Sequence, residues 1–138
     1  MKPEYLGILA VAVFWGGYPL IARGVGIGGP LGALMLSVVS LSTIAAATWW
    51  TGVETWPSVG DAVRLAIAGL MMGIGLLAFN AVAASRNVEA SVSIPIMDTA
   101  MLVVSVVAAV LFFAEPITLR KTLGLALLVA GIVVLRPE

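Results

Sequence analysis

The 138-residue chain contains no cysteine and no histidine. The first absence excludes disulfides and thiolate chemistry, the second excludes imidazole acid–base catalysis, and together they remove the usual protein ligands of zinc and copper. Charged residues make up only 10% of the chain, with seven Lys and Arg against seven Asp and Glu. This balance provides neither the basic surface that binds nucleic acid nor an acidic tail. We therefore expect no metal site, no nucleic-acid partner, and no cofactor beyond a coupling proton.

Apolar residues, in contrast, make up 62% of the chain, and the mean hydropathy is +1.17. A soluble domain is about 45–50% apolar, and a globule of this length could not enclose so much apolar surface. Lipid must therefore be the solvent for most of the chain. We expect a multi-pass protein of the inner or plasma membrane, with the lipid bilayer as its first partner.

Five apolar segments approach the length of about 20 residues that a helix requires to cross a hydrocarbon core of about 30 Å. Charges and clusters of proline and glycine separate them, and the predicted spans cover residues 5–22, 31–51, 62–85, 91–114 and 119–135. The first also has the pattern of a signal peptide, but four more apolar segments follow it, so we interpret it as a retained span. The connectors are short, which predicts one all-α, polytopic domain over residues 1–138.

An odd number of spans places the two termini on opposite sides of the membrane, where positive residues set the orientation. Four fall on the N-terminal side and three on the other: Lys2, Arg64, Arg120 and Lys121 against Arg23, Arg86 and Arg136. Either the chain simply has few charges, or it inserts in both orientations and forms a homodimer with an inverted copy. In the second case, two chains would supply the halves that many transporters carry as inverted repeats.

Several residues in and beside the last two predicted spans occur in the order and spacing of a known family pattern. These are Ala90, Ser91, Pro95, Glu115, Pro116, Gly124 and Gly131. With the pair Trp15 and Gly16 in the first span, the chain resembles one five-helix repeat of the EamA type, from the drug/metabolite transporter superfamily. Most members carry two such repeats in opposite orientation, and a single unit resembles the short bacterial and archaeal branch.

This resemblance implies a secondary transporter of small metabolites or drugs. The chain is also similar in logic to the four-helix small multidrug resistance proteins, which work as antiparallel homodimers. The essential glutamate in the first helix of those proteins has no counterpart here, because Glu4 precedes the first span. The role of any other carboxylate must therefore be argued from its chemistry.

Asp98 is the only charged side chain between Ser91 and Ala114. An ionised carboxylate at the bilayer centre costs about 2.5–3.5 kcal/mol, so Asp98 needs water, a cationic substrate, a hydrogen-bond donor or a bound proton. If the fourth helix begins near Ser91, Asp98 lies about 10 Å inside it and would bind substrate or a proton, with Ser105 on the same helical stripe. If the helix begins at Pro95, Asp98 is a structural anchor in its first turn.

Three further residues are candidates for substrate contact. Trp15 and Tyr18 are three residues apart and share one helix face, where aromatic rings would either hold an organic cation or pack. Asn80, in the third span, would hydrogen-bond either a substrate or a neighbouring helix.

Two pairs of glycines are predicted to pack helices. Gly69 and Gly73 have the small-xxx-small spacing that lets two helices approach closely. Gly124 and Gly131, seven residues apart, would place the fifth helix against another helix, such as its counterpart in an inverted copy.

These observations lead to one preferred function. We expect a transporter that exports small metabolites or drugs, with cationic or zwitterionic amines favoured, by alternating access as an antiparallel homodimer. The alternative is a non-transporting accessory subunit or membrane scaffold of a larger carrier. An intramembrane enzyme is not expected, because the chain has no histidine, cysteine or evident carboxylate pair to perform catalysis.

Overall fold

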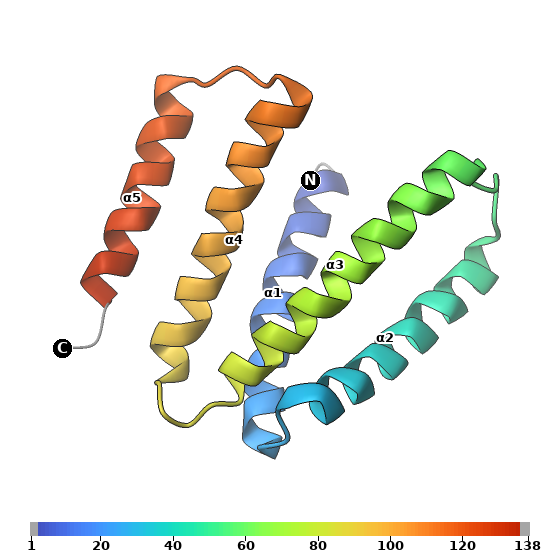
Figure 1. The fold of residues 1–138 in the computed structure, drawn as a ribbon, viewed down its shortest axis with the longest axis horizontal. Helices are drawn as coiled ribbons and strands as arrows, with labels where there is room; N and C mark the ends of the chain where they lie inside the picture. The colour runs from blue at the N-terminus through green and yellow to red at the C-terminus, as the bar shows by residue number, and fades with distance from the viewer. Residues whose placement is uncertain (1–2, 136–138) are drawn as a thin grey trace. The chain divides into compact units, whose positions relative to one another are not determined.

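The computed structural model describes residues 3–135, which form five α-helices and, within that range, no strand (Figure 1). The helices are α1 (Pro3–Val25), α2 (Gly29–Thr51), α3 (Val59–Ala83), α4 (Ala90–Phe113) and α5 (Leu119–Leu135). The expected all-α fold with five helices is confirmed. The helices pack as two compact units, one made of α1, α2 and α3 and the other of α4 and α5.

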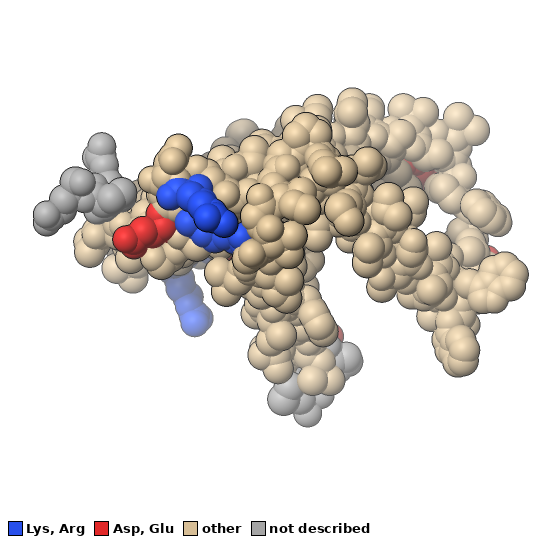
Figure 2. Space-filling model, turned by 90° about the horizontal axis from the view of Figure 1, so that it is seen from below, with Lys and Arg blue, Asp and Glu red and all other residues tan. Residues whose placement is uncertain are grey.

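The first four helices are long and apolar enough to cross a membrane, with mean hydropathies from 1.7 for α1 to 2.4 for α4. Only 6–11% of each apolar stretch is buried within the chain, and uncharged side chains cover most of the face drawn in Figure 2. The protein is therefore a multi-pass membrane protein, as the composition predicted. The helix α5 has 17 residues and is not among these four, so its crossing of the membrane stays a prediction.

Glycine and proline produce the short turn between α1 and α2. Gly26 has a φ of 75°, a left-handed conformation that ends helices, and its N–H donates to the carbonyl of Arg23 at 3.1 Å. Gly28 then caps α2, and Pro30 occupies the first turn, where its fixed φ favours helix. Three residues are therefore enough to turn the chain from one helix into the next.

The start of α2 lies directly against the end of α3. A Cβ added to Gly28 would overlap the Cβ of Ala84, and one added to Gly32 would overlap the carbonyl oxygen of Ile27 and Nδ2 of Asn80. Small residues allow helices in lipid to approach in this way, and dispersion contacts then hold them together. The close helix contact of this unit is thus made by Gly28 and Gly32.

Gly69 and Gly73, the glycines predicted to mediate helix packing in α3, have no such neighbour. A Cβ at either position would meet no atom within 4 Å outside its own helix backbone. Their packing role stays a prediction, since no neighbour within the first unit fills the space beside them.

The C-terminal half of α1 is attached to α3 at the same end of the unit. Pro19 is the largest fully buried side chain among the described residues. Four residues later, Nη1 of Arg23 donates a hydrogen bond to the carbonyl of Ala83 at 3.2 Å. The last carbonyls of a helix have no partner inside the helix, so Arg23 satisfies one that α3 leaves free.

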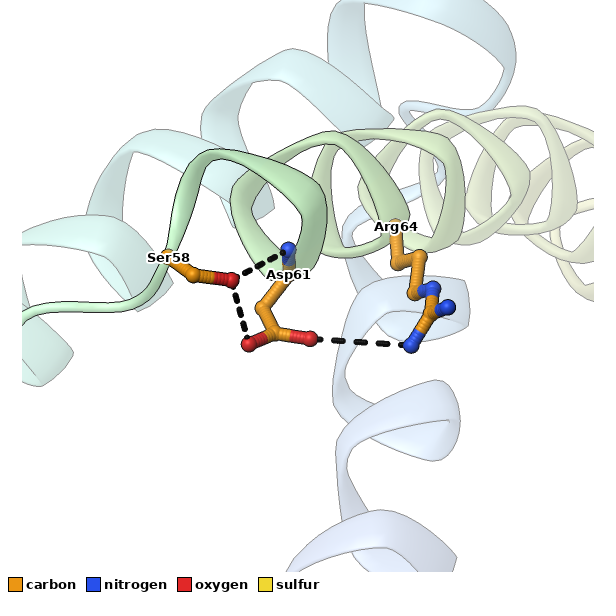
Figure 3. A network of polar contacts seen from close by, with 3 residues as sticks. All are labelled: Ser58, Asp61 and Arg64. Carbon is orange, nitrogen blue, oxygen red and sulfur yellow. Dashed lines mark hydrogen bonds and ion pairs between the residues drawn. The ribbon is translucent and has the colours of Figure 1, made fainter.

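The other end of α3 is closed by its own polar residues (Figure 3). Oγ of Ser58 accepts a hydrogen bond from the N–H of Asp61 at 3.2 Å and donates to Oδ2 of Asp61 at 2.7 Å. Asp61 also forms an ion pair with Arg64 at 3.6 Å. A capping serine and an acidic residue in the first turn stabilise a helix start, and α3 accordingly begins at Val59.

In the second unit, α4 and α5 form an antiparallel hairpin (Figure 1). Ala114 ends α4 with a φ of 51°, in the left-handed region that follows many helices. Nζ of Lys121 then pairs with Oε2 of Glu115 at 2.9 Å, and Oγ1 of Thr118 accepts from the N–H of Lys121 at 3.3 Å. The connector is therefore tied to the first turn of α5 by both a side-chain ion pair and a cap.

We predict that Gly32→Ala lowers the free energy of unfolding by about 1–3 kcal/mol, because its Cβ has to displace Ile27 and Asn80. The matched control is Gly7→Ala in α1, where a Cβ meets no atom within 4 Å. The measurement is thermal unfolding of the detergent-solubilised full chain. Equal melting temperatures for the two variants would contradict the close packing of α2 against α3.

Candidate functional site

The start of α4 determines where Asp98 lies. The helix begins at Ala90, with Glu89 as its N-cap, and continues through Pro95. The alternative start at Pro95 is therefore wrong, and Asp98 is not in the first turn. At about 1.5 Å per residue, Asp98 lies about 12 Å along a helix of about 36 Å, whereas the hydrocarbon core is about 30 Å thick. Centring α4 in the bilayer would put the carboxylate within the hydrocarbon region, so this location stays a prediction.

Two hydroxyl side chains accompany Asp98 in α4. Ser93 and Thr99 are buried, with exposed fractions of 5% and 8%. Among the described residues, Oγ of Ser93 has no hydrogen-bond partner, although burying an unpaired hydroxyl is costly. Sequence reasoning missed both residues, because a lone serine or threonine is ordinary in an apolar helix. The one signal that the sequence offered was their position close to Asp98 along the chain.

Pro95 adds a main-chain group to this segment. A proline inside a helix lacks the N–H that would bond to the carbonyl four residues earlier, here that of Ser91. One segment of α4 therefore carries a carboxylate, two hydroxyls and a carbonyl without its usual helical N–H partner. Of these groups, the carboxylate of Asp98 is the one that can bind a proton or a protonated amine.

The first unit brings together the aromatic residues predicted in α1. The rings of Trp15 and Tyr18 meet edge to face, with centroids 6.4 Å apart and planes at 84°. Tyr18 also contacts Phe79 of α3, with ring centroids 5.9 Å apart. Sequence reasoning missed Phe79, because nothing distinguished it from other apolar residues of its span. The cluster packs α1 on α3 through Tyr18, while Trp15 remains 63% exposed.

Asn80 follows Phe79 and is only 2% exposed. Its Nδ2 donates a hydrogen bond to the carbonyl of Gly29 at 3.3 Å, which joins α3 to the start of α2. Of the two roles open to this amide, the bond to a neighbouring helix is therefore present in this structure. A role in binding substrate stays a prediction.

Ser105 lies elsewhere, in a groove of the second unit between α4 and α5. The groove has a volume of about 400 Å³, and Gly124 of α5 lines it as well. A Cβ at Gly124 or Gly131 would meet no atom within 4 Å, so neither glycine packs tightly within the chain. The predicted role of this pair in dimerisation is untested and stays a prediction.

The polar side chains of the first and second units thus lie in different environments. In the first unit, Asn80 and Arg23 hydrogen-bond to main-chain carbonyls at helix ends. In the second, Asp98 and Ser93 lie inside an apolar helix, and such intramembrane polar groups mark pathways for ions and substrates. The Asp98 segment of α4 is therefore the strongest candidate for binding chemistry.

Comparison with known proteins identifies the family of the chain and leaves the role of Asp98 a prediction. A family described as the EamA-like transporter family matches residues 2–136. The chain is also 29% identical over 103 residues to a protein named multidrug resistance protein mmr from Mycolicibacterium paratuberculosis (strain ATCC BAA-968 / K-10), a match that covers 75% of this chain and 87% of the relative. No solved structure matches the chain. The chain, a multi-pass helical membrane protein, therefore belongs to the EamA-like transporter family.

Proposed function

We propose that the protein is a secondary transporter that exports small metabolites or drugs by alternating access, as an antiparallel homodimer. The family match, which extends over residues 2–136, carries this proposal. The name of the relative, a multidrug resistance protein, supports small organic molecules as substrates. The carboxylate of Asp98 favours those that carry a positive charge, namely cationic or zwitterionic amines.

Asp98 is the proposed coupling residue. An ionised carboxylate in hydrocarbon costs about 2.5–3.5 kcal/mol, and either a bound proton or a bound cation offsets that cost. One carboxylate cannot be neutralised by both at once, so proton and substrate compete for it. Substrate binding would then release a proton and proton binding would release substrate, which couples the two fluxes in opposite directions.

The exposed face of Trp15 offers a further contact to an organic cation. A cation over the face of a tryptophan is stabilised by about 0.5–2 kcal/mol, depending on how far it is desolvated. The edge-to-face contact between Trp15 and Tyr18 restrains the indole, and Tyr18 is in turn packed on Phe79. A restrained ring loses less conformational entropy when a ligand binds.

The charge distribution and the five-helix architecture support the proposed homodimer. Transporters with inverted repeats move substrate at the interface of two similar halves, and this chain contains one five-helix unit. Its positive residues are divided four against three between the two sides, which is close to the balance that insertion in both orientations requires. An inverted copy would contribute the second half and a second Asp98.

We predict that Asp98→Asn reduces substrate-driven flux at least about tenfold, because an amide can neither exchange a proton nor neutralise a cation. Losing a hydrogen bond to a charged group costs about 1.5–3 kcal/mol, which corresponds to a factor of ten or more. The measurement is efflux of a fluorescent organic cation such as ethidium from proteoliposomes under a proton gradient, together with the dimer fraction after cross-linking.

Asp61→Asn is the matched control, because it removes a carboxylate that lies in the exposed first turn of α3. We expect this variant to retain wild-type flux. Unchanged flux in Asp98→Asn, at equal expression, would show that Asp98 has no part in coupling.

We also predict that reporters fused to the C-terminus are detected on both sides of the membrane. Arg86→Gln changes the division of positive residues from four against three to four against two, and Arg64→Gln changes it to three against three. Since the more positive side stays in the cytoplasm, the first variant should place the C-terminus outside more often and the second less often. Signal from one side only, in all three proteins, would contradict the inverted homodimer and point to a fixed partner.

A further inference from the structure

The groove between α4 and α5 has a shape and charge distribution that the transport proposal does not use. Apart from Ser105, its walls are aliphatic, with Leu102, Val106 and Val110 on α4 and Leu125 and Leu128 on α5. Its volume of about 400 Å³ lies in the range of sites that hold small organic ligands. The groove belongs entirely to the second unit.

The length of the groove matches the depth of one leaflet. Leu102 and Val110 are eight residues apart on α4, or about 12 Å along the helix axis. Half of a hydrocarbon core of about 30 Å is about 15 Å. An aliphatic channel that runs from the helix ends toward the middle of the membrane fits a single acyl chain.

Charged side chains line one end of the groove. Glu115 and Lys121 form an ion pair at 2.9 Å, so their charges offset each other. Arg120 also lines this end, and within residues 3–135 the structure gives its guanidinium no ion pair. The end of the groove therefore carries one uncompensated positive charge. Guanidinium groups bind phosphate through paired hydrogen bonds.

We propose that the groove between α4 and α5 binds an anionic phospholipid, with one acyl chain along the aliphatic walls and the phosphate on Arg120. Basic residues at the ends of membrane helices attract anionic lipids, and Arg120 lies in the first turn of α5, which would meet the head groups when α5 crosses the membrane as predicted. Any lipid can fill the aliphatic channel, but only an anionic one gains from the free charge. Gly124 keeps the channel open, because a side chain there would project into empty space.

The first experiment tests the phosphate contact. The full chain is reconstituted in nanodiscs of equimolar phosphatidylglycerol and phosphatidylcholine, extracted in mild detergent, and analysed by native mass spectrometry for retained lipid. We expect the wild type to retain phosphatidylglycerol preferentially and Arg120→Gln to reduce that preference about fivefold, the factor expected for one basic residue at the membrane surface. Arg64→Gln, which removes a positive charge paired with Asp61 in α3, should leave the preference unchanged.

The second experiment tests the acyl-chain contact. Gly124→Leu fills the groove without changing charge, and we expect it to lower retention of both lipids. Gly131→Leu lies on the same helix but outside the groove, and should retain lipid as the wild type does.

Three results would overturn the proposal. The same lipid preference in the wild type and Arg120→Gln would exclude the phosphate contact, and normal lipid retention in Gly124→Leu would exclude the acyl-chain contact. Loss of the dimer in Gly124→Leu with lipid retention unchanged would identify a second protein chain as the occupant. Flux through the transporter is not a readout here, so each of these results leaves the proposed transport function standing.

Discussion

Hydrocarbon offers no hydrogen bonds to a polypeptide backbone, and this constraint accounts for most of the structure. Every peptide group in the membrane must be satisfied inside the protein, so the apolar segments form helices, four of them long enough to cross a bilayer. The backbone groups that stay unsatisfied are at the helix ends, where the last carbonyls and the first N–H groups lack partners. Two polar residues of the first unit lie where they satisfy such groups: Arg23 binds the carbonyl of Ala83 at the end of α3, and Ser58 caps the start of α3. Asn80 instead joins α3 to α2 through the carbonyl of Gly29.

The same helix ends explain where the close packing occurs. Asn80 reaches the carbonyl of Gly29 only because Gly32 has no side chain at the point where the two helices meet. In lipid, helices associate through such close contacts and not through exclusion of water. The hydrogen bond and the glycine therefore depend on each other, and a larger residue at position 32 would weaken both the packing and the polar contact. Glycines without a neighbour, such as Gly73, contribute nothing of this kind within the unit.

The sequence predicted the helices well because their signal is the length of an apolar run, which proline, glycine and charge interrupt. The helix starts were less accurate: α3 begins at Val59, three residues before the predicted span, because the Ser58 cap extends the helix past the charged residue Asp61 at which the apolar run stopped. Asp98 was recognisable as the single charge in its span, and Trp15 with Tyr18 by their spacing. Phe79 and Gly32 were not, because their importance arises from contacts between helices that are distant in sequence. Ser93 became notable only once its burial was known.

Asp98 differs from the other polar groups in what offsets the free-energy cost of placing it in a membrane helix. The helix-end residues are compensated locally, by carbonyls and N–H groups that would otherwise be unpaired. An ionised carboxylate within hydrocarbon is costly, and an apolar residue at position 98 would avoid that cost. In the proposed transporter, the compensation comes from outside the helix, as a proton, a cation or water. The free energy of the protein then changes each time Asp98 exchanges its ligand. Alternating access requires such a difference in free energy between the ligand-bound states of the two conformations.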